Sequence, residues 1–134
     1  MLSKHPESCR FPHGHTRRIE VVVVADTLDA NDMVLDFKAL KLALKDYIDR
    51  FDHSMAVNRL DPLLGAMKGM GDQAVVEFDG DPTTERFAEL IYHFVADILL
   101  RGWASGNYSI PPMRARVERV RVGETPNSWA EYEG

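Results

Sequence analysis

The sequence has a single cysteine and no long apolar run, and both features limit the classes of protein to which it can belong. Its single cysteine, Cys9, excludes a disulfide within the chain and leaves a free thiol, which is typical of a reducing compartment. No run of apolar residues is long enough to span a membrane, and the first residues show no signal-peptide pattern. We therefore expect a cytoplasmic protein that does not bind membranes.

Basic residues are also in the minority. Sixteen Lys and Arg face 21 Asp and Glu, so the net charge is −5 and the pI is about 5.5. This balance argues against nucleic acid as the main partner. The hydrophobic share of 45% and the charged share of 28% are ordinary for a globular protein. At 134 residues the chain is expected to form one domain, residues 1–134.

The most informative stretch is residues 9–15, Cys-Arg-Phe-Pro-His-Gly-His. On an extended segment, His13 and His15 project to the same side and can both reach one metal ion, with Gly14 leaving room for it. Zinc is the preferred metal because imidazole nitrogens suit its tetrahedral geometry. Cys9 would lie close to this ion. The alternative is a polar strand start that follows a small buried cysteine.

Strands are predicted where β-branched and apolar residues alternate or cluster. The predicted strands are residues 17–25, residues 73–78, a strand that starts at about Arg114, and residues 128–132. In the first of them, Val22 and Val24 lie on the opposite face from Ile19, Val21 and Val23. Both faces of the sheet are then apolar, which predicts that a further layer, such as another subunit, covers the second face.

Two amphipathic helices are predicted. The first spans residues 37–51 with Asp36 as its N-cap, and its apolar stripe consists of Phe37, Leu40, Leu44, Ile48 and Phe51. The second begins with Asp81 as its cap and Pro82 in its first turn, and Gly102 ends it. Residues 58–72 and 103–112 are expected to be loops because they are rich in Gly, Pro and small polar residues.

Two further positions carry titrating groups. Asp52 and His53 follow the first helix, where they form either a proton relay or a solvated helix end. Glu124 shares the apolar face of its strand with Val120 and Val122, so its carboxylate needs a partner. A ring edge with paired donors, such as that of a pterin or a guanidine, would supply one. The alternative is a strand end that meets solvent.

Five motifs in this order resemble the family of 6-pyruvoyltetrahydropterin synthase and 6-carboxytetrahydropterin synthase, over nearly the whole chain. They are the segment 9–15, Met-Val-Leu-Asp-Phe at 33–37, the pair Asp52 and His53, Pro-Thr-Thr-Glu at 82–85, and the closing stretches 120–125 and 128–132. Together they are far more specific than any one of them alone.

The resemblance implies an α+β tunnelling fold. In this fold an antiparallel β-sheet carries two helices on one face, three subunits close an oligomeric barrel, and two trimers stack into a hexamer. It also implies a zinc-dependent lyase that converts 7,8-dihydroneopterin triphosphate with loss of triphosphate. The product would be a carboxy or a pyruvoyl pterin, and we favour the carboxy product, which belongs to queuosine biosynthesis.

The resemblance also implies the roles of single residues. Cys9 would abstract a proton, Asp52 and His53 would relay protons, and Glu124 would anchor the pterin and join proton transfer. Thr125 would bind substrate beside Glu124, while His13 and His15 would be zinc ligands. A thiolate is stabilised near a cation, which supports Cys9 as a base near neutral pH.

Two departures from the family pattern bear on these roles. The family's third zinc histidine lies on a strand upstream of the cysteine, and we expect that strand to be missing or incomplete here, which predicts weak zinc binding. His5 is the only upstream candidate. Arg17 and Gly123 stand where aromatic residues are more usual. The competing function is a non-catalytic oligomeric pterin- or purine-binding protein of the same fold.

Overall fold

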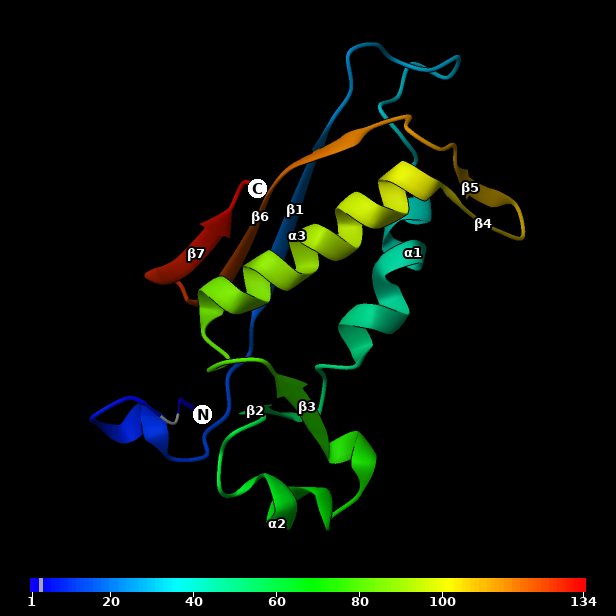
Figure 1. The fold of residues 1–134 in the computed structure, drawn as a ribbon. Coiled ribbons are helices and arrows are strands. Elements are labelled where there is room, and N and C mark those ends of the chain that lie inside the picture. The colour runs from blue at the N-terminus through cyan, green and yellow to red at the C-terminus, as the bar shows by residue number, and fades with distance from the viewer. Residues whose placement is uncertain (3) are drawn as a thin grey trace.

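The computed structural model describes residues 1–2 and 4–134. Figure 1 shows the elements in chain order. The helical segments are η1 (Ser8–Arg10), α1 (Phe37–Asp49), α2 (Leu64–Lys68), η2 (Asp72–Ala74) and α3 (Thr84–Arg101). The strands are β1 (Arg18–Val24), β2 (Met55–Asn58), β3 (Val75–Phe78), β4 (Trp103–Ser105), β5 (Tyr108–Ile110), β6 (Arg116–Thr125) and β7 (Ser128–Tyr132).

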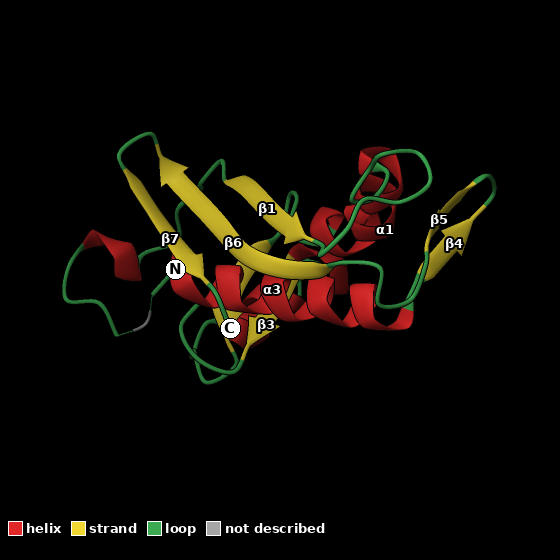
Figure 2. Cartoon of the chain, turned by 90° about the horizontal axis from the view of Figure 1, so that it is seen from above, coloured by secondary structure: helices red, strands yellow, loops and turns green. Residues whose placement is uncertain are grey.

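The main sheet has the order β1-β6-β7, and both of its strand pairs are antiparallel. Its central strand, β6, contributes Val120 and Val122, which are fully buried. They belong to one hydrophobic core that also contains residues of α1 and α3. Seen from above, the sheet forms one layer and α3 runs across one face of it (Figure 2). The prediction of an antiparallel sheet is confirmed, but the described residues form three α-helices rather than two, and α3 is the one that packs across the sheet.

The start of α1 follows the sequence prediction in its cap but not in its apolar stripe. The carboxylate of Asp36 accepts hydrogen bonds from the backbone N–H groups of Lys38 (2.7 Å) and Ala39 (3.4 Å), so the predicted N-cap is confirmed. Leu40 and Leu44 are buried as expected. Phe37 is 78% exposed, because in the first turn it lies at the rim of an open groove between α1 and β1 rather than in the core.

The start of α3 corrects the predicted cap. Thr83, not Asp81, is the N-cap, and its hydroxyl accepts a hydrogen bond from the N–H of Arg86 (3.2 Å). The two carboxylate oxygens of Asp81 instead accept from the Asn58 side chain and from the backbone of Lys4, both at 2.9 Å. Asp81 therefore ties the N-terminal segment and the end of β2 to the entry of α3.

Gly102 ends α3 as predicted, with φ of 79°. An added Cβ here would lie 2.8 Å from the ring of Pro112 and 2.9 Å from the carbonyl oxygen of Ile110. The position thus needs glycine for its backbone conformation and for space.

Both segments predicted as loops contain regular structure. Residues 58–72 include α2, and its Met67 is buried against Val57. Met70, which follows the helix, is exposed. Residues 103–112 form the β4–β5 hairpin, which projects from the body of the fold (Figure 1). Strand β2 was not predicted, and it pairs in parallel with β3. Both strands have four residues, but β2, Met-Ala-Val-Asn, has only one β-branched residue, whereas β3, Val-Val-Glu-Phe, is rich in residues that favour strands.

The second face of the sheet is less apolar than the sequence predicts. Val22 and Val24 are half-buried on it, but the register places Arg121 between Glu20 and Glu131 on neighbouring strands. Arg121 Nε donates to Glu131 Oε1 at 2.7 Å and lies 3.9 Å from Glu20 Oε2. Opposite charges on adjacent strands stabilise the pairing, so this face combines valines with a charge ladder.

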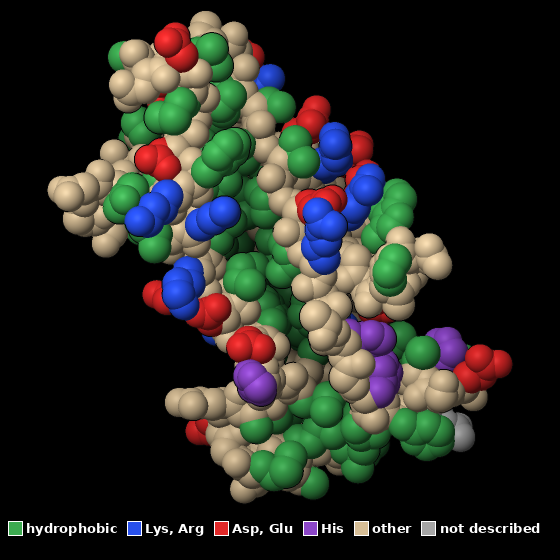
Figure 3. Space-filling view, turned by 180° about the vertical axis from the view of Figure 1, so that it is seen from behind, with side chains coloured by type: hydrophobic (Ala, Val, Ile, Leu, Met, Phe, Trp, Pro, Cys, Tyr) green, Lys and Arg blue, Asp and Glu red, His purple; other side chains and the backbone are tan. Residues whose placement is uncertain are grey.

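The groove between α1 and β1 is lined by apolar side chains with lysines along it: Ile19, Val21, Phe37, Leu40, Leu42, Leu44, Ile48, Lys38, Lys41 and Lys45. From behind, the molecule shows hydrophobic side chains along a hollow with basic residues on both sides (Figure 3). Within the described residues, no helix is both long and apolar enough to cross a membrane.

Candidate functional site

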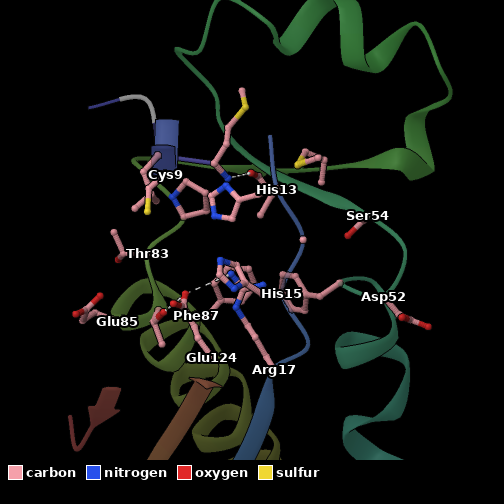
Figure 4. Close-up of a pocket in the computed structure, with 18 of the residues that line it drawn as sticks. Cys9, His13, His15, Arg17, Asp52, Ser54, Thr83, Glu85, Phe87 and Glu124 are labelled. Carbon is pink, nitrogen blue, oxygen red and sulfur yellow. Dashed lines mark hydrogen bonds and ion pairs between the residues drawn. The ribbon is translucent and has the colours of Figure 1, made fainter. Parts of the chain in front are cut away.

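A cleft with a volume of about 830 Å³ is built by segments far apart in the sequence. The N-terminal segment contributes Cys9, His13 and His15, and the end of β6 contributes Glu124. The entry of α3 and the turn after α1 complete its walls. Figure 4 shows Cys9 and His13 on one side of the cleft and Glu124 and Phe87 on the other, with His15 between them.

The two histidines of the 9–15 segment lie together. Their ring centroids are 4.7 Å apart and the rings meet edge to face at 83°. Nδ1 of His13 is 2.6 Å from the carbonyl oxygen of Phe11. A carbonyl oxygen can only accept, so Nδ1 carries a proton, and in the neutral ring Nε2 then keeps a lone pair for a metal ion.

The charge state of His15 also suits a metal ligand. Burial lowers the pKa of its imidazole, and although Glu124 opposes this change, Arg17 adds to it. A neutral ring, the form that binds zinc, is thereby favoured. In the described part of the chain, no group of three or more His, Cys, Asp or Glu residues could hold a metal ion. His13 and His15 thus fit two ligand positions of a zinc site, and the described residues of this chain supply no third ligand beside them.

The Glu124 carboxylate has partners, as the sequence required. The hydroxyl of Thr84, at the start of α3, donates to its Oε1. Nη2 of Arg17 lies 3.8 Å from the same oxygen, and the two side chains of this ion pair are only 22% (Arg17) and 27% (Glu124) exposed. Thr84 belongs to the Pro-Thr-Thr-Glu motif at 82–85, but the sequence did not predict it as a site residue, because only the fold brings α3 against the end of β6.

Arg17 fills the floor of the cleft beside Glu124. Its guanidinium carbon lies 4.1 Å from the centroid of the Phe87 ring, a cation–π contact. Its Nε is buried and has no hydrogen-bond partner within the described residues. Burial lowers the pKa of the guanidinium, and Glu124 opposes this change. The sequence marked Arg17 as a departure from the family pattern, but its contact with Phe87 follows only from the packing of α3.

The Asp52 and His53 pair lies at the rim of the cleft. Asp52 Oδ1 and His53 Nε2 are 3.8 Å apart, and the side chains are 76% (Asp52) and 94% (His53) exposed. Asp52 points away from the imidazoles (Figure 4). Within one chain, the fold therefore brings this pair to the cleft without contact with Cys9 or Glu124.

Two other sequence candidates lie outside the cleft. Thr125, the last residue of β6, is exposed, and its hydroxyl lies 2.6 Å from that of Ser128 and accepts from the N–H of Asn127. His5 accepts a hydrogen bond at Nδ1 from the N–H of Glu7 (3.1 Å) and does not line the cleft.

Comparison with known proteins gives concordant matches. The chain is 33% identical over 133 residues to a 6-carboxy-5,6,7,8-tetrahydropterin synthase from Aquifex aeolicus, which covers 96% of this chain and 78% of the relative. It is 29% identical to the enzyme of the same name from Rickettsia conorii, over 97% of this chain and 88% of the relative.

Solved structures share the fold. An uncharacterised protein from Wolinella succinogenes superposes with a TM-score of 0.75 at 22% identity, covering 95% of this chain and 81% of that one. A 6-pyruvoyl tetrahydropterin synthase from Plasmodium vivax superposes with a TM-score of 0.65 at 15% identity, covering 91% and 80%. The family model for 6-pyruvoyl tetrahydropterin synthase matches residues 1–134. The chain therefore belongs to the 6-pyruvoyl tetrahydropterin synthase family.

Proposed function

We propose that the chain is a zinc-dependent lyase of the 6-carboxytetrahydropterin synthase type. Its substrate would be 7,8-dihydroneopterin triphosphate, which loses triphosphate in the reaction. The names of the relatives from Aquifex aeolicus and Rickettsia conorii support a carboxy rather than a pyruvoyl product.

One observation carries this proposal. Cys9, His13, His15 and Glu124 were singled out from two distant stretches of sequence, and all four line the same cleft. The cleft combines a thiol, two imidazoles and a half-buried carboxylate, which are the groups required for metal-assisted proton abstraction from a substrate held by its ring edge.

Each of these groups has a task that its chemistry allows. Glu124 would accept hydrogen bonds from the N–H groups of the pterin ring edge and so fix the side chain of the substrate toward the imidazoles. His13 and His15 would hold the zinc ion. When bound, zinc supplies Lewis acidity that makes the carbon-bound protons of the substrate side chain easier to remove.

Cys9 would act as the base in this arrangement. Its thiolate would take a proton from a side-chain carbon next to the one that bears the triphosphate. The electron pair of that C–H bond then forms a carbon–carbon double bond, and the C–O bond to triphosphate breaks, with its electrons leaving on the triphosphate. This elimination keeps all three side-chain carbons, so a carboxy product would also require cleavage of a side-chain carbon–carbon bond and release of a two-carbon fragment. Asp52 and His53, exposed at the rim, would exchange protons between the cleft and solvent.

Turnover and product identity test the proposal together. The protein is incubated with zinc and 7,8-dihydroneopterin triphosphate, triphosphate release is followed, and the pterin product is identified by mass. We expect release of triphosphate and a carboxy product. Cys9→Ala should lower turnover by at least about 100-fold, the usual contribution of a general base, while leaving zinc content unchanged. Unchanged turnover in Cys9→Ala would contradict the role of the thiol.

The competing function is a non-catalytic oligomeric protein that binds pterins or purines. It is favoured by the absence of a third metal ligand near His13 and His15 among the described residues. Pterin binding without triphosphate release, in protein supplied with zinc, would support this alternative and overturn the lyase.

A further inference from the structure

Two hydrogen-bonding groups on the floor of the cleft have no partner within the described residues. Thr84 and Arg17 both approach Oε1 of Glu124. The other carboxylate oxygen, Oε2, accepts no hydrogen bond from the described residues. Beside it, Nε–H of Arg17 donates to nothing. The ion pair between Arg17 and Glu124 is 3.8 Å long, too long for a hydrogen bond. The cleft wall thus contains an acceptor and, next to it, a buried donor, and neither is fully used.

We propose that Arg17 is a specificity-determining residue, whose guanidinium donates to the ring carbonyl of a ligand while Glu124 accepts from the neighbouring ring N–H groups. This inference rests on the proposed function, because it concerns how the same cleft selects a pterin. Besides the anchor that Glu124 provides, the cleft would then contain a positively charged donor that recognises the ring carbonyl.

The chemistry of the ring edge fits this pair. A 2-amino-4-oxo pteridine carries, in order, an amino donor, a ring N–H donor and a carbonyl acceptor. A carboxylate accepts from the first two, and a guanidinium next to it donates to the third. A 2,4-diamino pteridine replaces the carbonyl with a second amino donor and the ring N–H with an acceptor. Donor would then face donor at Arg17, and acceptor would face acceptor at Glu124.

The position of Arg17 supports a fixed role. The Phe87 ring, 4.1 Å from the guanidinium carbon, supports its planar face, and burial restricts the side chain. Because Nε is buried, its N–H reaches a ligand carbonyl only if the guanidinium turns in its plane over the Phe87 ring, and this turn would recover the hydrogen bond that the present arrangement leaves unmade. A residue that only neutralised Glu124 would not need to leave a buried donor unpaired.

The test measures the ratio of the affinities for two ligands rather than the affinity for one. Neopterin, with a 4-oxo ring, and a 2,4-diamino pteridine are titrated into the full chain, at a pH where both rings are neutral, and binding is followed by calorimetry. The variants are R17M, which removes the donors, and R17K, which keeps the charge but not the planar fork. The matched control is R18M, because Arg18 is the next residue and its side chain is 84% exposed.

Wild type and R18M should prefer neopterin by at least about 30-fold, since a site built to hydrogen-bond a group rejects an analogue that lacks it. R17M should bring this preference to within about 3-fold, mainly through weaker neopterin binding. If R17M does not fold, a preference lowered at least about 3-fold in R17K carries the same conclusion.

Neopterin binding with an unchanged preference in R17M, or in R17K where R17M does not fold, overturns this inference and leaves the proposed function standing. Failure of wild type to bind neopterin, or to prefer it over the diamino pteridine, also overturns this inference, whereas the proposed function falls only if triphosphate release from 7,8-dihydroneopterin triphosphate fails.

Discussion

The hydroxyl of Thr84 is the one hydrogen-bond donor that the described residues supply to the Glu124 carboxylate. A hydrogen bond to a charged group in a half-buried site contributes more than a neutral one and also fixes the direction of the carboxylate. The geometry of the anchor therefore depends on a residue at the start of α3 as well as on the strand that carries Glu124.

Thr84→Val should weaken neopterin binding by about 10-fold and lower the free energy of unfolding by about 1–2 kcal/mol, because it removes this donor and keeps the shape of the side chain. Thr84→Ser, which retains the hydroxyl, is the matched control and should bind nearly as well as wild type. Binding is measured by calorimetry and stability by urea unfolding. Equal neopterin affinity in the Val and Ser variants would show that the hydrogen bond does not position the anchor.

At the residue scale, the sequence predicts the site where chemistry and spacing coincide. His13 and His15 are two residues apart, and this spacing alone suggests that they can meet, as their 4.7 Å ring separation shows. Thr84 and Phe87 carried no such signal, because a threonine and a phenylalanine at a helix start are ordinary in any fold. Their roles arise from the packing of α3 on β6, which no local pattern encodes.

Among the elements, the junction between α3 and the β4–β5 hairpin depends most on one residue. Gly102 lies between Arg101, the last residue of α3, and Trp103, the first of β4, with φ of 79°. The ring of Pro112 packs where a side chain at this position would have to go. The hairpin is thereby folded back at a fixed angle from the end of α3.

Gly102→Ala should lower the free energy of unfolding by about 3 kcal/mol, because it adds a steric clash to an unfavourable backbone conformation. Gly106→Ala is the matched control: its φ of 56° is also positive, but an added Cβ there meets no atom within 4 Å. We expect a loss of only about 1 kcal/mol in the control. Chemical denaturation measures both, and equal losses would mean that the contact with Pro112 is not what fixes this junction.

The elements that the sequence missed are short ones held by distant partners. Helix α2 has five residues, and β2 has four residues with one β-branched side chain and pairs with β3. In contrast, α1 and α3 have 13 and 18 residues, so a helical period is visible in the sequence. The cap of α3 was misplaced by two residues because both Asp81 and Thr83 are good capping residues, and only the fold gives Asp81 other partners.

For the molecule as a whole, β1 has an edge that pairs with no other strand in the described part of the chain. The apolar groove between α1 and β1 opens beside this strand. Exposed edges and apolar grooves are surfaces that proteins usually cover. These surfaces, together with the assembly that the family resemblance implies, lead us to propose a homo-oligomer, a trimer or a hexamer.

Light scattering over a range of micromolar concentrations tests this proposal. We expect a mass three or six times the chain mass of 15.2 kDa, stable on dilution. The charge ladder of Glu20, Arg121 and Glu131 is screened by salt, so the measurement is repeated at high ionic strength to separate ionic from apolar contacts. A monomer at every concentration would contradict the oligomeric barrel.

The proposed lyase depends on metal held by His13 and His15, and two protein ligands should hold zinc weakly. We therefore expect dialysis against a mild chelator to remove it. The most direct test is to add zinc in steps to this metal-free protein while recording triphosphate release from 7,8-dihydroneopterin triphosphate. Turnover should rise with zinc, and it should be absent at every zinc concentration from a variant that combines His13→Ala and His15→Ala. Full turnover by the metal-free protein, or by that double variant, would contradict the account.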